Sequence, residues 1–219
     1  ERARENDVAI AYVNMVGGQD ELVFDGGSVV LSTSGEVVAR ARQFEEDLLV
    51  CDVSVPDSGG VEGHIAISHE ATASRPALPA SDARPLADLE EVYAALVTGT
   101  RDYAHKAGFE TAVLALSGGI DSTLVAVIAT DALGPANVVV VSMPSRYSSE
   151  GSVLDAKDLA RNLGIELMTT SIEPVFSAYL STLEGAFEST ESDVAEENLQ
   201  SRIRGDLVMA LSNKFGYLA

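Results

Sequence analysis

Short uninterrupted apolar runs alternate with segments of helical periodicity between residues 111 and 215. The apolar runs cover residues 111–117, 137–143 and 165–172. The helical segments cover residues 122–133, 151–163, 175–187 and 194–215. A strand that is apolar on both faces must be covered on both faces, as in parallel sheets with helices on either side. The pattern therefore predicts an α/β fold with a doubly wound parallel sheet.

The N-terminal part of the chain has a different pattern, in which short β-branched runs are separated by Gly-containing turns. Such runs predict a sheet with hairpins. The expected strands are residues 8–16, 22–24, 28–33, 36–44 and 48–55.

The two patterns are separated by residues rich in Pro, Gly and Ser, which predict a linker. After it, apolar residues recur at helical spacing over residues 86–97, and Pro85 suits the start of that helix. We expect three parts: a β-rich domain at 1–56, a linker at 57–85 and an α/β domain at 86–219.

The chain is strongly acidic, with 34 Asp and Glu against 14 Lys and Arg and a formal net charge of −20. This charge argues against general binding to nucleic acid or to an anionic membrane surface. Cys51 is the one cysteine, which excludes an internal disulfide and a Cys-built zinc site. No apolar run is long enough to cross a bilayer, and we expect a cytoplasmic protein.

The sequence Ala-Leu-Ser-Gly-Gly-Ile-Asp-Ser at residues 115–122 lies where the first buried strand passes into a helix. In an open parallel sheet, ligands bind at the carboxyl ends of the strands, where the following helices begin. Gly118 and Gly119 permit positive φ and a close approach of a ligand to the backbone. Free N–H groups, the Ser117 and Ser122 hydroxyls and the helix dipole then favour a phosphate group. The structural alternative is a Gly-rich turn that holds no ligand.

Asp121 is unsuited to a simple anion site, because its carboxylate repels phosphate. It fits a site in which Mg²⁺ lies between the carboxylate and the phosphates. The segment lacks the Lys of a Walker A loop and does not match GxGxxG. These departures argue against kinase-type γ-phosphate transfer and against a Rossmann-bound dinucleotide.

The motif at residues 117–122 resembles the phosphate loop of the ATP pyrophosphatases, which have an adenine nucleotide alpha hydrolase-like fold and cut ATP between the α- and β-phosphates. Residues 143–152 resemble the adenine-side loop of glutamine-dependent NAD synthetases, and residues 196–213 resemble their deamido-NAD-contacting helix. Residues 16–28 and 43–53 resemble the closing strands of the nitrilase-like glutaminase domain in that family. The resemblance implies that residues 1–56 are the end of a nitrilase-like α/β sandwich.

The resemblance also implies the binding residues. Those for ATP are Ala115, Leu116, Ser117, Gly118, Gly119, Ile120, Asp121, Ser122, Met143 and Arg146, with Asp121 as the Mg²⁺ ligand. Those for deamido-NAD are Asn198, Arg202 and Arg204. The structural alternatives are a core Met143, a solvated Arg146 and ordinary surface charges at Arg202 and Arg204.

The implied activity is ATP-dependent amidation of deamido-NAD to NAD through an adenylated intermediate, with ammonia derived from glutamine. The implied cofactors are ATP and Mg²⁺, and the whole protein is expected to be a homo-oligomer. Two other readings stay open: another ATP pyrophosphatase, either GMP synthetase-like or tRNA-modifying, and a non-catalytic adenine-nucleotide-binding module.

The glutaminase of this family uses a Glu–Lys–Cys triad, and the sequence does not match it. Cys51 lies in an apolar run and is predicted to be a buried strand residue, and Lys106 is the first lysine. We expect the triad upstream of Glu1, and a further ATP- and Mg²⁺-binding segment beyond Ala219. Such a fragment is expected to bind ATP weakly and to turn over poorly or not at all.

Overall fold

The computed structural model describes residues 1–54, 78, 82–188, 190, 191 and 193–219. Contacts within the chain divide it into two compact units, which are treated separately below. The first unit comprises Glu1–Gly17 and Leu22–Ala95, and the second comprises Gly18–Glu21 and Leu96–Ala219. Most of the predicted linker lies outside the described residues.

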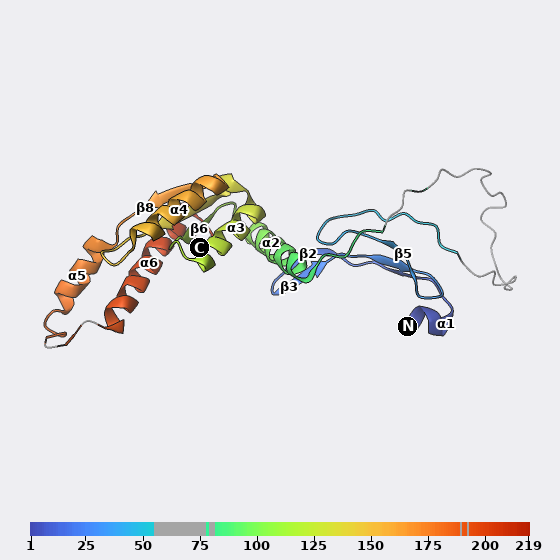
Figure 1. The fold of residues 1–219 in the computed structure, drawn as a ribbon, viewed down its shortest axis with the longest axis horizontal. Coiled ribbons are helices and arrows are strands. Elements are labelled where there is room, and N and C mark those ends of the chain that lie inside the picture. Colours follow the sequence, from blue (N-terminus) through green and yellow to red (C-terminus); the bar gives the residue numbers. More distant parts are fainter. Residues whose placement is uncertain (55–77, 79–81, 189, 192) are drawn as a thin grey trace. The chain divides into compact units, whose positions relative to one another are not determined.

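The first unit is rich in strands, as predicted (Figure 1). Its antiparallel sheet has the order β1–β4–β5, in which Ala11 is opposite Val30 and Val30 is opposite Ala39. β2 and β3 form a two-stranded sheet, and β2 runs from the first unit into the second at Gly18. Neither the short N-terminal helix, α1, nor β2, which lies between the expected strands at residues 8–16 and 22–24, was predicted. The bounds are α1 Arg2–Asn6, β1 Ile10–Tyr12, β2 Val16–Gln19, β3 Leu22–Asp25, β4 Val29–Leu31 and β5 Val37–Arg40.

Three strand predictions in this unit were wrong in extent. The expected strand at residues 36–44 ends at Arg40, the last residue of β5. The expected strand at residues 8–16 is interrupted after β1, because the Asn14 N–H donates to Ser28 Oγ (3.0 Å) and its side-chain amide donates to Asp25 (3.0 Å). The expected strand at 48–55 is absent over residues 48–54, and Leu48 is 85% exposed. Cys51 therefore lies in an irregular segment and is half-buried, not in a buried strand.

The second unit contains a parallel sheet of order β6–β7–β8 (Figure 1). The strands are β6 Ala112–Ala115, β7 Val138–Ser142 and β8 Glu166–Thr169. On the other side of β6, Leu218 forms a parallel bridge with Ala112. The Leu218 N–H donates to the Thr111 carbonyl (2.9 Å), and the Val113 N–H donates to the Leu218 carbonyl (2.7 Å).

The helices match the predicted alternation. They are α2 Asp88–Lys106, α3 Ile120–Leu133, α4 Glu150–Leu163, α5 Glu173–Leu183 and α6 Val194–Phe215, with a short 3₁₀ helix η1 at Pro135–Asn137. α4 ends at Gly164 in the left-handed conformation (φ 70°), which glycine adopts without steric cost. α2 begins three residues after Pro85, so Pro85 does not occupy its first turn. No helix in the described part of the chain is long and apolar enough to cross a membrane.

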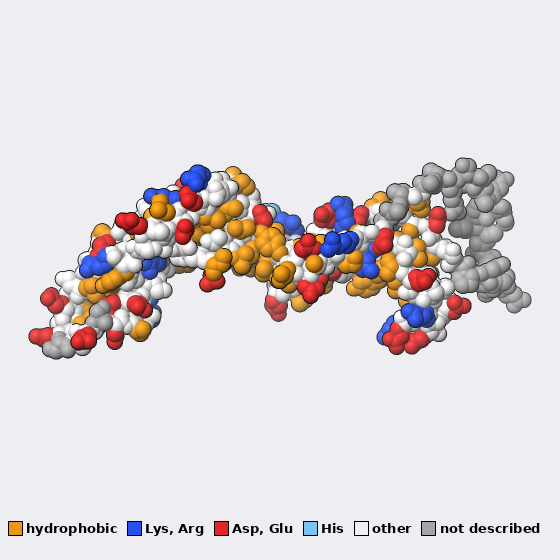
Figure 2. Space-filling model, viewed as in Figure 1, with side chains coloured by type: hydrophobic (Ala, Val, Ile, Leu, Met, Phe, Trp, Pro, Cys, Tyr) orange, Lys and Arg blue, Asp and Glu red, His pale blue; other side chains and the backbone are white. Residues whose placement is uncertain are grey.

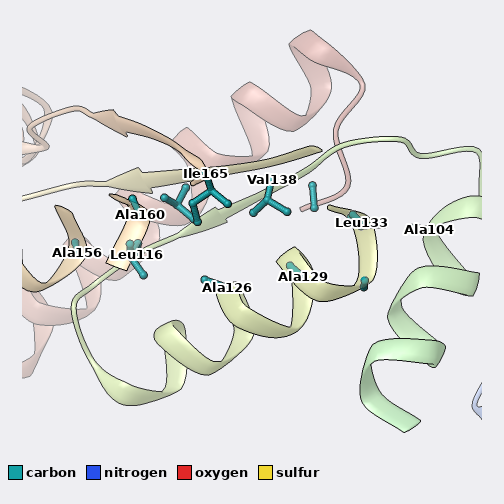
Figure 3. Close-up of a cluster of buried hydrophobic side chains, with 12 residues drawn as sticks. Ala104, Leu116, Ala126, Ala129, Leu133, Val138, Ala156, Ala160 and Ile165 are labelled. Carbon is teal, nitrogen blue, oxygen red and sulfur yellow. The ribbon is translucent and has the colours of Figure 1, made fainter. Parts of the chain in front are cut away.

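Alternate residues of the sheet pack into two separate clusters. Val138 and Val140 belong to a cluster with small residues of α3 and α4, and Figure 3 shows Ala126 and Ala129 of α3 beside Val138. Val139 belongs to the opposite cluster, which includes Phe176 of α5 and Ile203 of α6. The sheet is therefore covered on both faces, which confirms the predicted doubly wound α/β fold.

Charge is spread over the surface of both units. Figure 2 shows acidic side chains at many separate places on the viewed face, with Lys and Arg side chains scattered among them. The net charge of −20 is therefore not concentrated in one patch on that face. Local features must decide where an anionic ligand binds.

Candidate functional site

The turn between β6 and α3 is held by its own serine hydroxyls. Ser117 Oγ lies 3.0 Å from Ser122 Oγ and accepts a hydrogen bond from the Gly119 N–H (3.2 Å). Ser122 Oγ accepts from the Ser117 N–H (3.3 Å) and is 3.1 Å from the Gly119 carbonyl. Leu116 anchors the turn, because it is 2% exposed and its N–H donates to the Val141 carbonyl (2.9 Å). The turn is thus preorganised by contacts within the protein.

The two glycines of the turn have different roles. Gly118 has a φ of 81°, and a Cβ on it would lie 2.4 Å from the carbonyl oxygen of Ser152, in the first turn of α4. Glycine is therefore required at 118 by the close approach of α4 as well as by φ. Gly119 has φ −84° and ψ 160°, a conformation open to any residue, so position 119 does not use the positive φ that glycine permits.

The first turn of α3 follows directly. Its first backbone bond runs from the Thr123 N–H to the Gly119 carbonyl (3.1 Å). The N–H groups of residues 120–122 therefore have no helix carbonyl to donate to and are available to bind an anion. Ile120 is 78% exposed, and Asp121 is exposed in the same turn.

The Asp121 carboxylate has no hydrogen-bond or ion-pair partner among the described residues. Its hard oxygen atoms, next to free N–H groups, are suited to a Mg²⁺ ion that also binds phosphate. Among the described residues, no group of three or more His, Cys, Asp or Glu side chains is placed to hold a metal ion. A Mg²⁺ ion bound to Asp121 would therefore need further ligands from the phosphate groups. The residues present fit a metal ion that arrives with a nucleotide.

A cavity of about 400 Å³ lies beside the turn. Its volume is in the range of small-molecule sites. It is lined by the end of β6, the end of β7, the loop after β7, the first turn of α4 and one residue of α6. The lining residues are Ala115, Leu116, Ser117, Val141, Ser142, Met143, Pro144, Tyr147, Ser148, Ser149, Ser152, Val153 and Arg204.

Met143 and Arg204 meet at this cavity from different elements. The Met143 side chain is 5% exposed and packs in the cluster with Phe176 and Ile203. Its carbonyl oxygen accepts a hydrogen bond from Arg204 Nε (3.2 Å). Burial lowers the pKa of the Arg204 guanidinium, which nevertheless stays protonated. A partly desolvated cation at the cavity wall favours an anionic ligand.

Three of the other predicted binding residues, Arg146, Asn198 and Arg202, do not line the cavity. Arg146 lies outside the lining of the cavity and pairs with Glu173 of α5. Its backbone N–H also donates to Glu173 (3.1 Å), and its guanidinium donates to Ser177 Oγ (3.1 Å). Asn198 and Arg202 are exposed on α6 and do not line the cavity, whereas Arg204 does.

The Arg146–Glu173 pair gives a pH-dependent signal. The hydrogen bond from the Arg146 guanidinium holds the pKa of Glu173 below its usual value of 4.5, and the Arg146 backbone N–H and Ser177 act in the same direction. Because the folded-state pKa is depressed, the stabilisation is present above pH 4.5 and is lost as the pH falls through the folded-state pKa. The ¹⁵Nε resonance of Arg146 should therefore titrate with a midpoint below 4.5.

Glu173→Gln is the matched variant for that measurement. Its Arg146 Nε resonance should stay constant over the same acid range, because no carboxylate titrates beside it. A wild-type midpoint at or above 4.5, or the same titration in Glu173→Gln, would contradict the pairing.

The individual roles of several residues in and around the site were not predicted from the sequence. Ser149 caps α4 by accepting from the Ser152 N–H (3.1 Å), and both serines line the cavity. The paired serines before the helical run were the available signal for this cap. Gln200 and Glu173 were also missed, since a polar residue on a helix gives no sign of a distant partner.

Comparison with known proteins agrees with this geometry. The chain is 48% identical over 233 residues to the glutamine-dependent NAD(+) synthetase of Thermotoga maritima, covering 99% of this chain and 40% of that protein. A structure of glutamine-dependent NAD+ synthetase from Acinetobacter baumannii in complex with ADP has a TM-score of 0.78 and 38% identity, covering 99% of this chain and 38% of that one. The NH3-dependent NAD synthetase of Campylobacter jejuni has a TM-score of 0.54 and 26% identity over 60% of this chain and 55% of that one.

Two family models divide the chain in the predicted order. The carbon-nitrogen hydrolase model matches residues 1–61. The NAD synthase model matches residues 92–219, which include β6, α3, the loop after β7 and α6. Because this match spans more than half of the chain and contains the whole lining of the cavity, the chain belongs to the NAD synthase family.

Proposed function

We propose that the chain binds ATP at the cavity beside the β6–α3 turn and takes part in the ATP-dependent amidation of deamido-NAD to NAD. The observation that carries the proposal is a cavity that Ser117 of the preorganised turn lines together with the partly buried Arg204. The free N-terminus of α3 follows that turn directly, although residues 118–122 do not themselves line the cavity. The relatives' names and the ADP complex of the A. baumannii protein support adenine nucleotide as the ligand.

The proposed chemistry begins at the α-phosphorus of ATP. A carboxylate oxygen of the nicotinate ring of deamido-NAD forms a bond to that phosphorus, the bond to the oxygen bridging to the β-phosphorus breaks, and pyrophosphate leaves. Ammonia then adds to the activated carbonyl carbon, AMP leaves and one proton is released, which gives the amide.

The residues of this chain orient reactants and stabilise charge; none of them forms a covalent bond. The N–H groups of residues 120–122 donate to phosphate oxygens, and their fixed positions favour the charge that develops on the leaving pyrophosphate. Arg204, which the sequence resemblance assigned to deamido-NAD, lines the cavity and is proposed to supply positive charge there instead. Asn198 and Arg202 are proposed to orient deamido-NAD from α6, which favours attack by raising the effective concentration of the carboxylate.

Mg²⁺ is the proposed metal, with Asp121 as its protein ligand. When bound, the ion would supply Lewis-acid stabilisation of phosphate charge. Ammonia from glutamine and a homo-oligomeric whole protein also remain proposals. The chain spans 40% of the length of the T. maritima relative. The amidation activity of a protein of that full length is therefore part of the proposal.

The test uses saturation-transfer NMR of the purified chain, because that method detects weak binding. ATP should give saturable signals for adenine and ribose protons, whereas xanthosine monophosphate, the substrate type of a GMP-forming relative, should give none at equal concentration. Absence of any ATP signal, or a stronger xanthosine monophosphate signal, would overturn the proposed function.

A further inference from the structure

The loop between β7 and α4, residues 143–149, is attached to α6 at two points. The Ser145 hydroxyl donates to Gln200 Oε1 (2.8 Å), and Arg204 Nε donates to the Met143 carbonyl (3.2 Å). Gln200 and Arg204 are four residues apart, so they lie on one face of α6. Gln200 is 7% exposed, which is unusual for an amide side chain on a helix.

Ser145 joins this contact to the internal structure of the loop. Its hydroxyl oxygen accepts from the Tyr147 N–H (3.3 Å), and its own N–H donates to Ser148 Oγ (3.0 Å). Because the hydroxyl proton is directed to Gln200, a lone pair of the same oxygen is available to Tyr147. Tyr147 and Ser148 line the cavity, whereas Ser145 and Gln200 do not.

We propose that Gln200 is a positioning residue for nucleotide binding. Through the Ser145 hydroxyl it fixes the loop 143–149 in the conformation that forms one wall of the cavity. The same helix carries Asn198 and Arg202, so the nucleotide wall and the proposed deamido-NAD residues share one rigid element. The inference rests on the proposed function, because it requires that nucleotide binds at this wall.

The energetic reason is the burial of the pair. If Gln200 loses its oxygen, the Ser145 hydroxyl loses its acceptor in a part-buried position, and such a loss costs more than a solvent-exposed hydrogen bond. The loop can then rotate away, and the cavity wall must be ordered again when nucleotide binds.

The experiment compares four variants of the full chain by ATP titration and by hydrogen exchange without nucleotide. Gln200→Leu and Ser145→Ala should each weaken ATP binding about 5- to 10-fold. The double variant should bind ATP no more weakly than the weaker-binding single variant, since both changes remove the same Ser145–Gln200 hydrogen bond. Ser145→Thr keeps the hydroxyl and should bind within about twofold of the wild type.

The exchange measurement separates positioning from general loss of structure. Amides of residues 145–148 should exchange faster in Gln200→Leu and Ser145→Ala, while the β6–β7 ladder should keep its protection. If the wild type binds ATP and both single variants bind equally well, or if the double variant is additive, the positioning role is overturned and the proposed function stands. If the wild type does not bind ATP, the proposed function itself fails.

Discussion

Replacing Gly118 with Ala is expected to abolish measurable nucleotide binding. An Ala at φ 81° is strained, and its Cβ would lie 2.4 Å from the Ser152 carbonyl oxygen, so the turn or the first turn of α4 must shift. Strain and overpacking together should lower the free energy of unfolding by about 2–4 kcal/mol. A displacement of the turn by roughly 1 Å should weaken nucleotide binding by about 100-fold or more. Urea unfolding and ATP titration measure the two effects.

Gly108→Ala is the matched control. Gly108 has the same φ of 81°, but a Cβ there would meet no atom within 4 Å, and Gly108 lies just after α2, outside the β6–α3 turn. The strain of the positive φ alone should lower the free energy of unfolding of Gly108→Ala by about 1–2 kcal/mol, and the variant should keep its nucleotide affinity. Equal losses of affinity in Gly108→Ala and Gly118→Ala would show that the contact with α4 is not what requires glycine at 118.

Asp121→Asn is expected to remove the effect of Mg²⁺ on nucleotide binding. In the wild type, Mg²⁺ should strengthen ATP binding on the order of tenfold, because the ion joins the carboxylate to the phosphates. Without the ion, the exposed carboxylate repels the phosphates, so in EDTA the Asn variant should bind ATP at least as well as the wild type. The measurement is ATP titration of both proteins with Mg²⁺ and with EDTA.

Asp155→Asn controls for the change in net charge. Asp155 is exposed on α4, outside the β6–α3 turn, so this variant should keep the full response to Mg²⁺. A response that is also retained in Asp121→Asn would show that Asp121 is not the metal ligand. The same result would favour a nucleotide-binding module in which phosphate is held by backbone groups alone.

The α/β unit could be predicted well because its strands are buried on both faces. Runs such as residues 137–143 have no polar face, and a parallel sheet covered by helices is the one common setting for them. α6 was predicted with its observed bounds, where Asp193 and Gly216 cap its two ends. The β-rich unit was harder, because its strands are short and side chains such as Asn14 compete for backbone partners.

The candidate site could be predicted where the ligand-binding groups follow one another in sequence. The turn at residues 115–122 combines a strand end, glycines and a helix start, so its position at the sheet edge follows from local pattern. The role of Gly118 could not be derived in this way, since its neighbour Ser152 is distant in sequence. The same holds for Gln200 and Glu173, whose partners belong to the loop 143–149.

A crystal structure of the chain with a non-hydrolysable ATP analogue and Mg²⁺ tests the central claim most directly. We predict phosphate oxygens within hydrogen-bonding distance of the N–H groups of residues 120–122, a Mg²⁺ ion bound to Asp121, and the nucleotide in the cavity lined by Met143 and Arg204. A nucleotide bound at another place, with this turn in contact only with water, would contradict the proposed site.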